Sequence, residues 1–169
     1  QKRLQAVLEH LPVGIWFTDA DGRIVYGNPA GRRIWAGARY VGPSEYAVYK
    51  GWWEDSGEPI APEDWSVTRA IVDGETSLNE MIRIQSFDGG QRVILNSVVP
   101  MRDGDGRIIG AAILNEDITD RRENEMALSE IRKDLEKRVE QRTDELRKRA
   151  DQLSQLTSQL TVLEQNERR

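Results

Sequence analysis

The chain has 169 residues, with 24 Lys and Arg against 29 Asp and Glu and a net charge of −5. It has no basic stripe of the kind that binds nucleic acid, and no apolar run reaches the roughly 18 residues that cross a bilayer. It also has no cysteine, which excludes disulfides, thiolate metal sites and cysteine nucleophiles. We therefore expect a cytoplasmic protein without nucleic-acid, membrane or metal partners.

The composition changes once along the chain. Every glycine, proline and aromatic residue lies at or before Gly110, and residues 111–169 contain none of the three. We expect an amphipathic helix over residues 1–12, a folded domain over 13–119 and a long helix over 120–169. Because the sequence does not begin with methionine, we also expect it to be part of a longer chain.

The first residues have a helical apolar pattern. Leu4, Val7, Leu8 and Leu11 recur at helical spacing before a proline. His10, the one histidine of the chain, lies on this segment. A surface or interface role is expected for it, rather than that of a catalytic base.

Two strands and a short helix are expected next. "VGIWFT" and "RIVYGN" are rich in β-forming residues and flank the turn sequence "DADG". Asn28 followed by Pro29 is typical of a helix N-cap and first helical residue, and Gly37 is a plausible stop.

The middle of the chain predicts an irregular stretch, a helix and three more strands. Residues 38–61 are interrupted by glycine and proline, and a helix is expected from Pro62 to Gly74. "SLNEMIRIQS", "QRVILNSVVPM" and "RIIGAAILNED" follow, separated by glycine-rich turns. This order predicts an α+β domain with a five-stranded antiparallel sheet and helices on one face.

The two ends of this domain resemble a known family. "FTDADGRIVYGNPAGRRIWAG" and "EMIRIQSFDGGQRVILNSVVPMRDGDGRIIGAAILNEDITDRR" are similar to the opening and closing segments of PAS domains, including the exit motif Asp117-Ile118-Thr119. The resemblance covers roughly residues 3–122 and is weak over 38–61. It implies a sensory module that binds a small molecule or cofactor between sheet and helices, and that is often dimeric.

The last segment has the heptad pattern of a parallel, two-stranded coiled coil. Leu146, Leu153 and Leu160 are seven residues apart. The step of four from Leu135 to Val139 follows another step of four, so four residues are added to the repeat, which is a stutter. Two arginines then fall at core positions, where like charges would face each other, so this stretch could be a register switch or a tolerated irregularity. The expected core is Leu128, Ile131, Leu135, Val139, Arg142, Leu146, Arg149, Leu153, Leu156, Leu160 and Leu163.

This helix also resembles the linker between PAS domains and the phosphotransfer helices of bacterial sensor histidine kinases. "TVLEQNERR" is similar to the lead-in of such kinases, and the chain stops before any phosphate-accepting histidine. The resemblance implies the sensory and dimerising part of a two-component kinase, without enzymatic turnover of its own. A ligand-free structural spacer, or a sensor for another output such as a cyclase, stays open.

No glycine or proline separates the last strand from this helix. Asp117, Ile118, Thr119 and Asp120 are therefore predicted to transfer a movement of the sheet to the helix, and Asp120 with Glu123 resembles a capping box. A short connection that simply packs well is the alternative. The homodimer is expected to form through the long helix and through residues 1–12.

Pocket residues are expected in the irregular stretch and on the strands. The candidates are aromatic side chains that could wall a pocket or form core, and polar or flexible side chains of the later strands. They are Tyr46, Tyr49, Trp52, Trp53, Trp65, Glu80, Met81, Arg83 and Asn96. The cofactor is not identified: the helix beginning at Pro62 lacks the axial histidine of haem-binding relatives, and the missing cysteine excludes a flavin–cysteinyl adduct.

Overall fold

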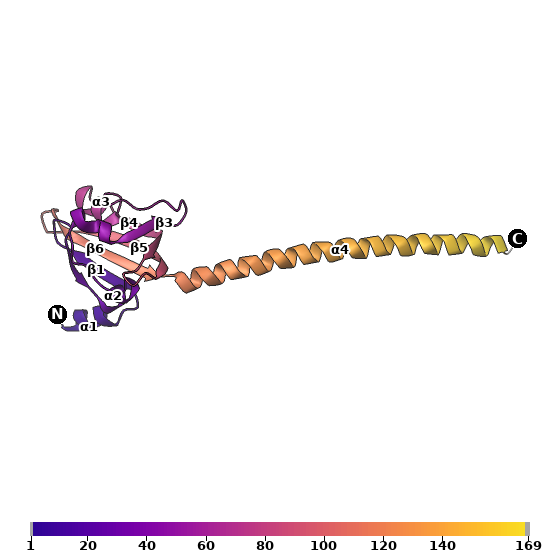
Figure 1. The fold of residues 1–169 in the computed structure, drawn as a ribbon, viewed down its shortest axis with the longest axis horizontal. Coiled ribbons are helices and arrows are strands. Elements are labelled where there is room, and N and C mark those ends of the chain that lie inside the picture. The colour runs from indigo at the N-terminus through magenta and orange to yellow at the C-terminus, as the bar shows by residue number, and fades with distance from the viewer. Residues whose placement is uncertain (1, 168–169) are drawn as a thin grey trace. The chain divides into compact units, whose positions relative to one another are not determined.

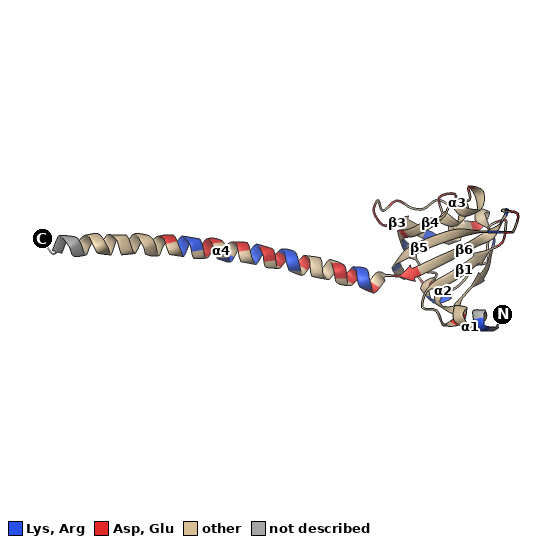
Figure 2. Ribbon diagram, turned by 180° about the vertical axis from the view of Figure 1, so that it is seen from behind, with Lys and Arg blue, Asp and Glu red and all other residues tan. Residues whose placement is uncertain are grey.

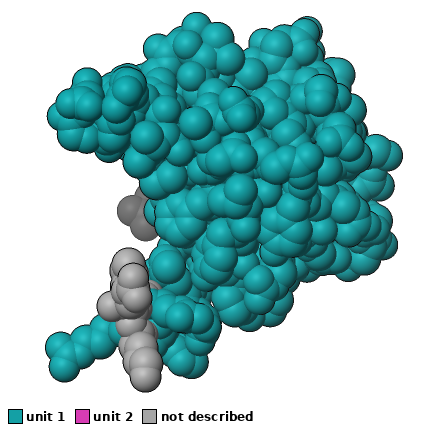
Figure 3. All heavy atoms as spheres, turned by 90° about the vertical axis from the view of Figure 1, so that its left-hand side faces the viewer, with its two compact units in different colours: residues 1–122 teal, residues 123–169 magenta. Residues whose placement is uncertain are grey.

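The computed structural model describes residues 2–167 of the chain. They fall into two compact units, residues 1–122 and residues 123–169. Figure 3 shows the atoms of the first unit as a closely packed body. Within the described residues, no helix combines the length and the apolar character needed to cross a membrane.

The first unit begins with helix α1 (Lys2–His10) and the hairpin of β1 (Gly14–Thr18) and β2 (Ile24–Gly27). Short helices α2 (Pro29–Ile34) and η1 (Pro43–Val48), strand β3 (Lys50–Trp53) and helix α3 (Ser66–Val72) follow. Strands β4 (Ser77–Gln85), β5 (Gln91–Arg102) and β6 (Ile108–Asp117) complete it (Figure 1). Helix α4 (Thr119–Glu167) continues from the first unit into the second.

The strands form one antiparallel sheet in the order β2-β1-β6-β5-β4-β3. The expected α+β class with an antiparallel sheet is therefore confirmed, with one strand more than the five expected. The additional strand, β3, lies in the stretch expected to be irregular and pairs with β4 at the sheet edge, Gly51 opposite Ile84. Only this pairing defines so short a strand, because its four residues "KGWW" show no alternation of their own.

Helices α2 and α3 pack on one face of the sheet, against β1, β5 and β6. Alternate residues of the central strands point toward them, and Ile82, Ile94 and Val98 are at most 1% exposed. The opposite face is less well covered, since Val99 and Leu114 are each 40% exposed. The core therefore lies between the sheet and the short helices.

Helix α3 starts later than expected. Its first residue is Ser66, with Trp65 as N-cap, whereas Pro62 was expected to begin the helix. The preceding residues form a turn in which the Asp64 N–H donates to the Ala61 carbonyl at 3.0 Å. This later start places Trp65 inside the domain, where it is 8% exposed.

Asn28 joins the N-terminal helix to the sheet. Its side chain is completely buried. Its Oδ1 accepts from the amides of Ile15 and Gly31 at 2.9 and 2.8 Å, and its Nδ2 donates to the carbonyls of Leu8 and Val13, both at 2.9 Å. The expected N-cap of α2 is thus confirmed, and the same side chain holds the end of α1 against the start of β1.

Candidate ligand cavity and signal-transfer site

A small cavity lies between the sheet and the helices that cover it. Its volume, counted as the space that the centre of a water-sized sphere can reach, is about 50 Å³. Its wall is contributed by β1, β2, β5 and β6 together with the short helices. The lining residues are Trp16, Ile24, Trp35, Tyr46, Tyr49, Trp65, Ser66, Val67, Asn96, Val98, Ile113 and Asn115.

The expected pocket residues divide into two groups. Tyr46, Tyr49, Trp65 and Asn96 line the cavity. The remaining expected residues lie elsewhere: Trp53, Glu80 and Met81 line a separate surface groove, and Trp52 and Arg83 are half-buried partners across β3 and β4.

Sequence reasoning missed several lining residues. Trp16 and Asn115 face the cavity from β1 and β6, and alternation with the buried Thr18 and Ile113 on those strands could have indicated them. Trp35 follows α2 and Ser66 is the first residue of α3, and no local pattern distinguishes them. Their place in the wall depends on contacts distant in sequence.

The aromatic side chains of the wall also pack on one another. The ring centroids of Trp35 and Tyr49 lie 4.9 Å apart in an edge-to-face arrangement, and those of Trp35 and Trp65 lie 6.4 Å apart. Phe87 closes this group at 5.2 Å from Tyr49, with the Arg39 guanidinium 4.6 Å from the Phe87 ring centre. The same rings therefore serve as domain core and as cavity wall.

Both cavity tyrosines are neutral and have polar partners within the domain. The Tyr46 hydroxyl donates to the Gly22 carbonyl, and burial, aided by the nearby Asp19 charge, raises the pKa of Tyr46 far above its usual range. The Tyr49 hydroxyl donates to the Arg39 carbonyl at 2.8 Å and accepts the amide of the same residue at 2.9 Å. Burial also raises the pKa of Tyr49.

A line of buried polar side chains, which we call the amide relay, crosses the cavity wall. The Trp35 Nε1–H donates to Asn115 Oδ1 at 3.0 Å, and Asn115 Nδ2 donates to Asn96 Oδ1 at 2.9 Å. Asn96 Nδ2 then donates to Ser66 Oγ. The two asparagines are directly opposite each other on β5 and β6. The amide relay therefore connects the end of α2, both central strands and the start of α3.

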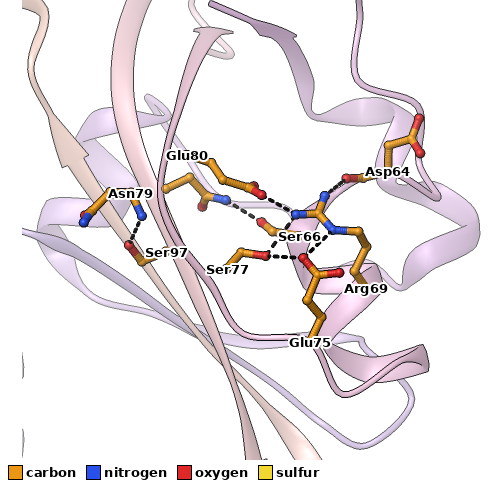
Figure 4. A network of polar contacts seen from close by, with 9 residues as sticks. Asp64, Ser66, Arg69, Glu75, Ser77, Asn79, Glu80 and Ser97 are labelled. Carbon is orange, nitrogen blue, oxygen red and sulfur yellow. Dashed lines mark hydrogen bonds and ion pairs between the residues drawn. The ribbon is translucent and has the colours of Figure 1, made fainter.

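Helix α3 is also fixed by an ion-pair network. Figure 4 shows the Arg69 guanidinium among Glu75, Ser77 and Glu80, with Ser66 beside it. Arg69 Nε lies 3.1 Å from Glu75 Oε1, and Nη2 contacts both Ser77 Oγ and Glu80 Oε1. The charge of Glu80 is thus used to hold α3 on β4, outside the cavity.

The end of the sheet continues into α4 through a compact set of hydrogen bonds. Asp117 Oδ1 accepts the amide and the hydroxyl of Thr119 at 3.0 and 2.5 Å, and Asp117 Oδ2 lies 3.0 Å from Arg92 Nη1. Thr119 Oγ1 accepts the Val93 amide at 3.0 Å, and the Ile118 amide donates to the Val93 carbonyl at 2.9 Å. Both contacts with Val93 tie the start of α4 and the residue before it to β5.

The carboxyl of Asp117 is held in its charged form. Burial by itself raises its pKa, but the hydrogen bonds from Thr119 and Arg92 outweigh burial and hold the pKa below its usual range. Asp120 lies in the first turn of α4 and is exposed, where a negative charge complements the helix dipole. Of the four expected signal-transfer residues, Asp117, Ile118 and Thr119 thus make contacts that join the sheet to α4.

The residues expected to form a coiled-coil core are exposed in the single chain. The exposed fractions of the leucines run from 55% at Leu156 to 66% at Leu128. Figure 2 shows charges of both signs along the first part of α4. In the sequence, residues 152–163 carry no charge. The leucines of α4 therefore recur as an exposed apolar stripe along the helix.

Comparison with protein families matches residues 8–123 to the PAS fold. The chain belongs to the PAS family. The match agrees with the order of sheet strands and helices and confirms the family expected from both ends of the domain. A search of curated proteins finds no match.

Solved structures show the same PAS fold. An RNA-binding light-oxygen-voltage receptor is 25% identical with a TM-score of 0.57, and the match covers 77% of this chain and 36% of that one, about a third of its length. A light-oxygen-voltage domain studied with a flavin analogue is 16% identical with a TM-score of 0.51, covering 78% and 93%. A PAS domain from Colwellia psychrerythraea is 19% identical with a TM-score of 0.50, covering 70% and 97%.

The cavity is smaller than a flavin. One bound water needs about 10–15 Å³ of the space counted here, so a cavity of about 50 Å³ accommodates only a few water-sized groups. A flavin contains three fused rings and exceeds this space. No cavity residue is a cysteine or histidine, and His10 is exposed on α1. Among the described residues, no cluster of acidic, histidine or cysteine side chains could hold a metal ion. The cavity as it stands suits a smaller molecule.

Proposed function

We propose that this chain is the sensory input and dimerisation module of a bacterial signal-transduction protein. A small molecule in the cavity would change the position of β5 and β6, and the change would pass into α4. The observation that carries the proposal is the connection at Ile118, the one residue between the last strand and the long helix. A connection this short transmits tilt or rotation that a flexible joint would absorb.

The amide relay supports this route. Asn96 on β5 and Asn115 on β6 are hydrogen-bonded to each other in the cavity wall. The same two strands fix the start of α4, because Arg92 of β5 binds Asp117 and the Val93 amide of β5 donates to Thr119. A ligand that alters the hydrogen bonds of either asparagine therefore acts on the strands that fix the start of α4. No element has to move independently between the cavity and the helix.

Dimerisation through α4 is the second half of the proposal. Leucines that recur every seven residues and stay more than half exposed favour a parallel, two-stranded coiled coil with a second copy. Helix α1 would add to this homodimer, since Val7 on it is 54% exposed. We further propose that the stutter between Leu135 and Val139 permits two registers of similar energy, which the ligand would bias.

A sensor histidine kinase of the bacterial cytoplasm is the parent protein that we propose. The support is the resemblance of residues 135–169 to the linker that precedes the phosphotransfer helices of such kinases. In this proposal the module regulates the kinase and carries no catalytic activity itself. A different output, such as a cyclase, would replace the kinase and leave the sensing part the same.

Cross-linking tests the dimer, because the chain has no cysteine of its own. Leu146→Cys at the proposed seam is expected to form a disulfide between two copies in mild oxidant. Asp151→Cys, on the outer side of the same heptad, is the matched control and should remain monomeric in denaturing gels. Equal cross-linking of both variants, or of neither, would contradict the parallel coiled coil.

A ligand-free structural spacer is the second candidate function, favoured by the small cavity and by aromatic side chains that also serve as core. Native mass spectrometry of the purified protein separates the two. A retained small molecule supports the sensor. Its absence, together with no thermal stabilisation in a screen of flavins, haem, aromatic acids and lipids, supports the spacer.

A further inference from the structure

The hydrogen bonds of the amide relay have a fixed direction. The Trp35 indole can only donate, so Asn115 must turn its oxygen toward it and its nitrogen toward Asn96. Asn96 must then accept with its oxygen and donate with its nitrogen. Ser66 Oγ, at the far end, therefore acts as the acceptor of this line, and its own proton remains to be donated.

The cavity wall consequently contains several donor groups that the relay does not use. The relay uses one N–H of each asparagine and leaves the second N–H of each amide and the Ser66 hydroxyl proton outside it. The buried Trp65 Nε1 has no hydrogen-bond partner among the described residues. Ser66, Asn96 and Asn115 are 2–4% exposed and Trp65 is 8% exposed, so bulk water does not satisfy these groups.

The wall is also uncharged. None of the residues that line it is acidic, basic or histidine, and both tyrosines keep their protons. A charged ligand would lose its hydration without gaining a counter-ion. The cavity volume is about 50 Å³, counted as the space open to the centre of a water-sized sphere. One bound water needs about 10–15 Å³ of such space, so the cavity accommodates about three to five water-sized groups. This is close to the size of a single small ring.

We propose that the cavity binds a small, uncharged, single-ring aromatic molecule that accepts hydrogen bonds through ring nitrogen or carbonyl oxygen. The aromatic walls, including Trp35 and Tyr49, would stack on its ring, while Ser66 and the asparagines donate to its acceptor atoms. This inference rests on the proposed sensory function. It adds a ligand chemistry that follows from the buried donors without a partner in the relay.

The test compares pyridazine with benzene, two rings of nearly the same shape that differ in two acceptor nitrogens. Titration of the full chain with each at millimolar concentration is followed by the indole and side-chain amide signals in ¹H–¹⁵N NMR. Pyridazine is expected to shift the signals of Trp65, Asn96 and Asn115 and to bind at least about fivefold more tightly than benzene. Benzoate and benzylamine, the charged rings, are expected not to bind.

Ser66→Ala provides the matched protein variant, because it removes the terminal hydroxyl and leaves the other members of the relay. Pyridazine affinity is expected to fall about five- to tenfold, while any benzene binding is unchanged. Ser86→Ala is the control: Ser86 is also buried, bonds the Ile34 carbonyl at 2.8 Å and does not line the cavity.

Three results would overturn the proposal. They are equal binding of benzene and pyridazine, preferred binding of a charged ring, and no binding of any probe, which would leave only water on the buried donors. Cross-linking through Leu146→Cys, measured on the same samples, reports the signalling dimer separately. A cross-linked dimer without pyridazine binding would reject this ligand class alone, whereas failure of both cross-linking and binding would also reject the sensory module.

Discussion

Many apolar side chains are buried in the first unit of this chain, whereas those of the second unit are exposed. In residues 1–122, Ile84 and Ile94 are completely buried within the single chain. In α4, Leu146 and Leu153 are each 65% exposed, although the helix is regular throughout. Burial within the single chain therefore stabilises the first unit, whereas the apolar stripe of α4 gains no such stabilisation within the single chain.

The largest effect is expected in the core of the first unit. Ile94→Ala removes buried methyl groups from β5 and leaves a cavity, so the free energy of unfolding is expected to fall by about 4 kcal/mol. Chemical denaturation followed by tryptophan fluorescence measures this change selectively, because all tryptophans precede α4.

Ile109→Ala, at a residue 50% exposed on β6, is the matched control and is expected to change the free energy by less than about 1 kcal/mol. If both substitutions had the same effect, burial within the single chain would not be what stabilises this unit.

The second effect concerns the proposed dimer of α4. Leu153→Lys places a charge at the proposed seam and is expected to weaken the dimer by on the order of 3 kcal/mol, about a hundredfold in its dissociation constant. Sedimentation equilibrium over a range of concentrations measures the constant. Gln155→Lys adds the same charge on the outer side of the helix and should leave dimerisation nearly unchanged. Equal weakening by both would indicate a nonspecific charge effect.

The third effect concerns the two arginines at the proposed seam of α4, whose replacement by leucine should strengthen the dimer. Arg142→Leu combined with Arg149→Leu replaces two charged seam positions by leucine, and the dimer is expected to gain about 2 kcal/mol. Arg147→Leu, outside the seam, is the control for added apolar surface. The helix unfolding transition in circular dichroism should move to higher temperature for the double variant alone. No gain would indicate that these arginines do not face a second copy.

The features that could be predicted from the sequence depend on local patterns. The heptad repeat of α4, the Asn28 cap and the long strands each follow from spacing within a few residues. Strand β3 could not be predicted, because Gly51 belongs to a strand only through its pairing with β4 and its contact with Trp65. The relay partners Trp35 and Asn115 are 80 residues apart, so no local pattern brings them together.

The smallest effect concerns the connection between β6 and α4. Because the hydrogen bonds of Asp117 hold its folded-state pKa below the unfolded value of about 3.8, they stabilise the fold above that pH. This contribution is lost as the pH falls through the lower, folded-state pKa. Asp117→Asn cannot titrate, so its free energy of unfolding is expected to fall less steeply than that of the wild type between about pH 5 and pH 3.

Glu116→Gln is the control for that comparison, because Glu116 is the exposed acidic neighbour of Asp117 on β6. Denaturant titrations at half-unit pH steps, followed by tryptophan fluorescence, give the slopes for all three proteins. Glu116→Gln measures how far the loss of an exposed carboxylate from the same strand end changes the slope by itself. If Asp117→Asn kept the wild-type slope, the hydrogen bonds to Thr119 and Arg92 would not stabilise the start of α4, and the proposed signal transfer would lack its charged anchor.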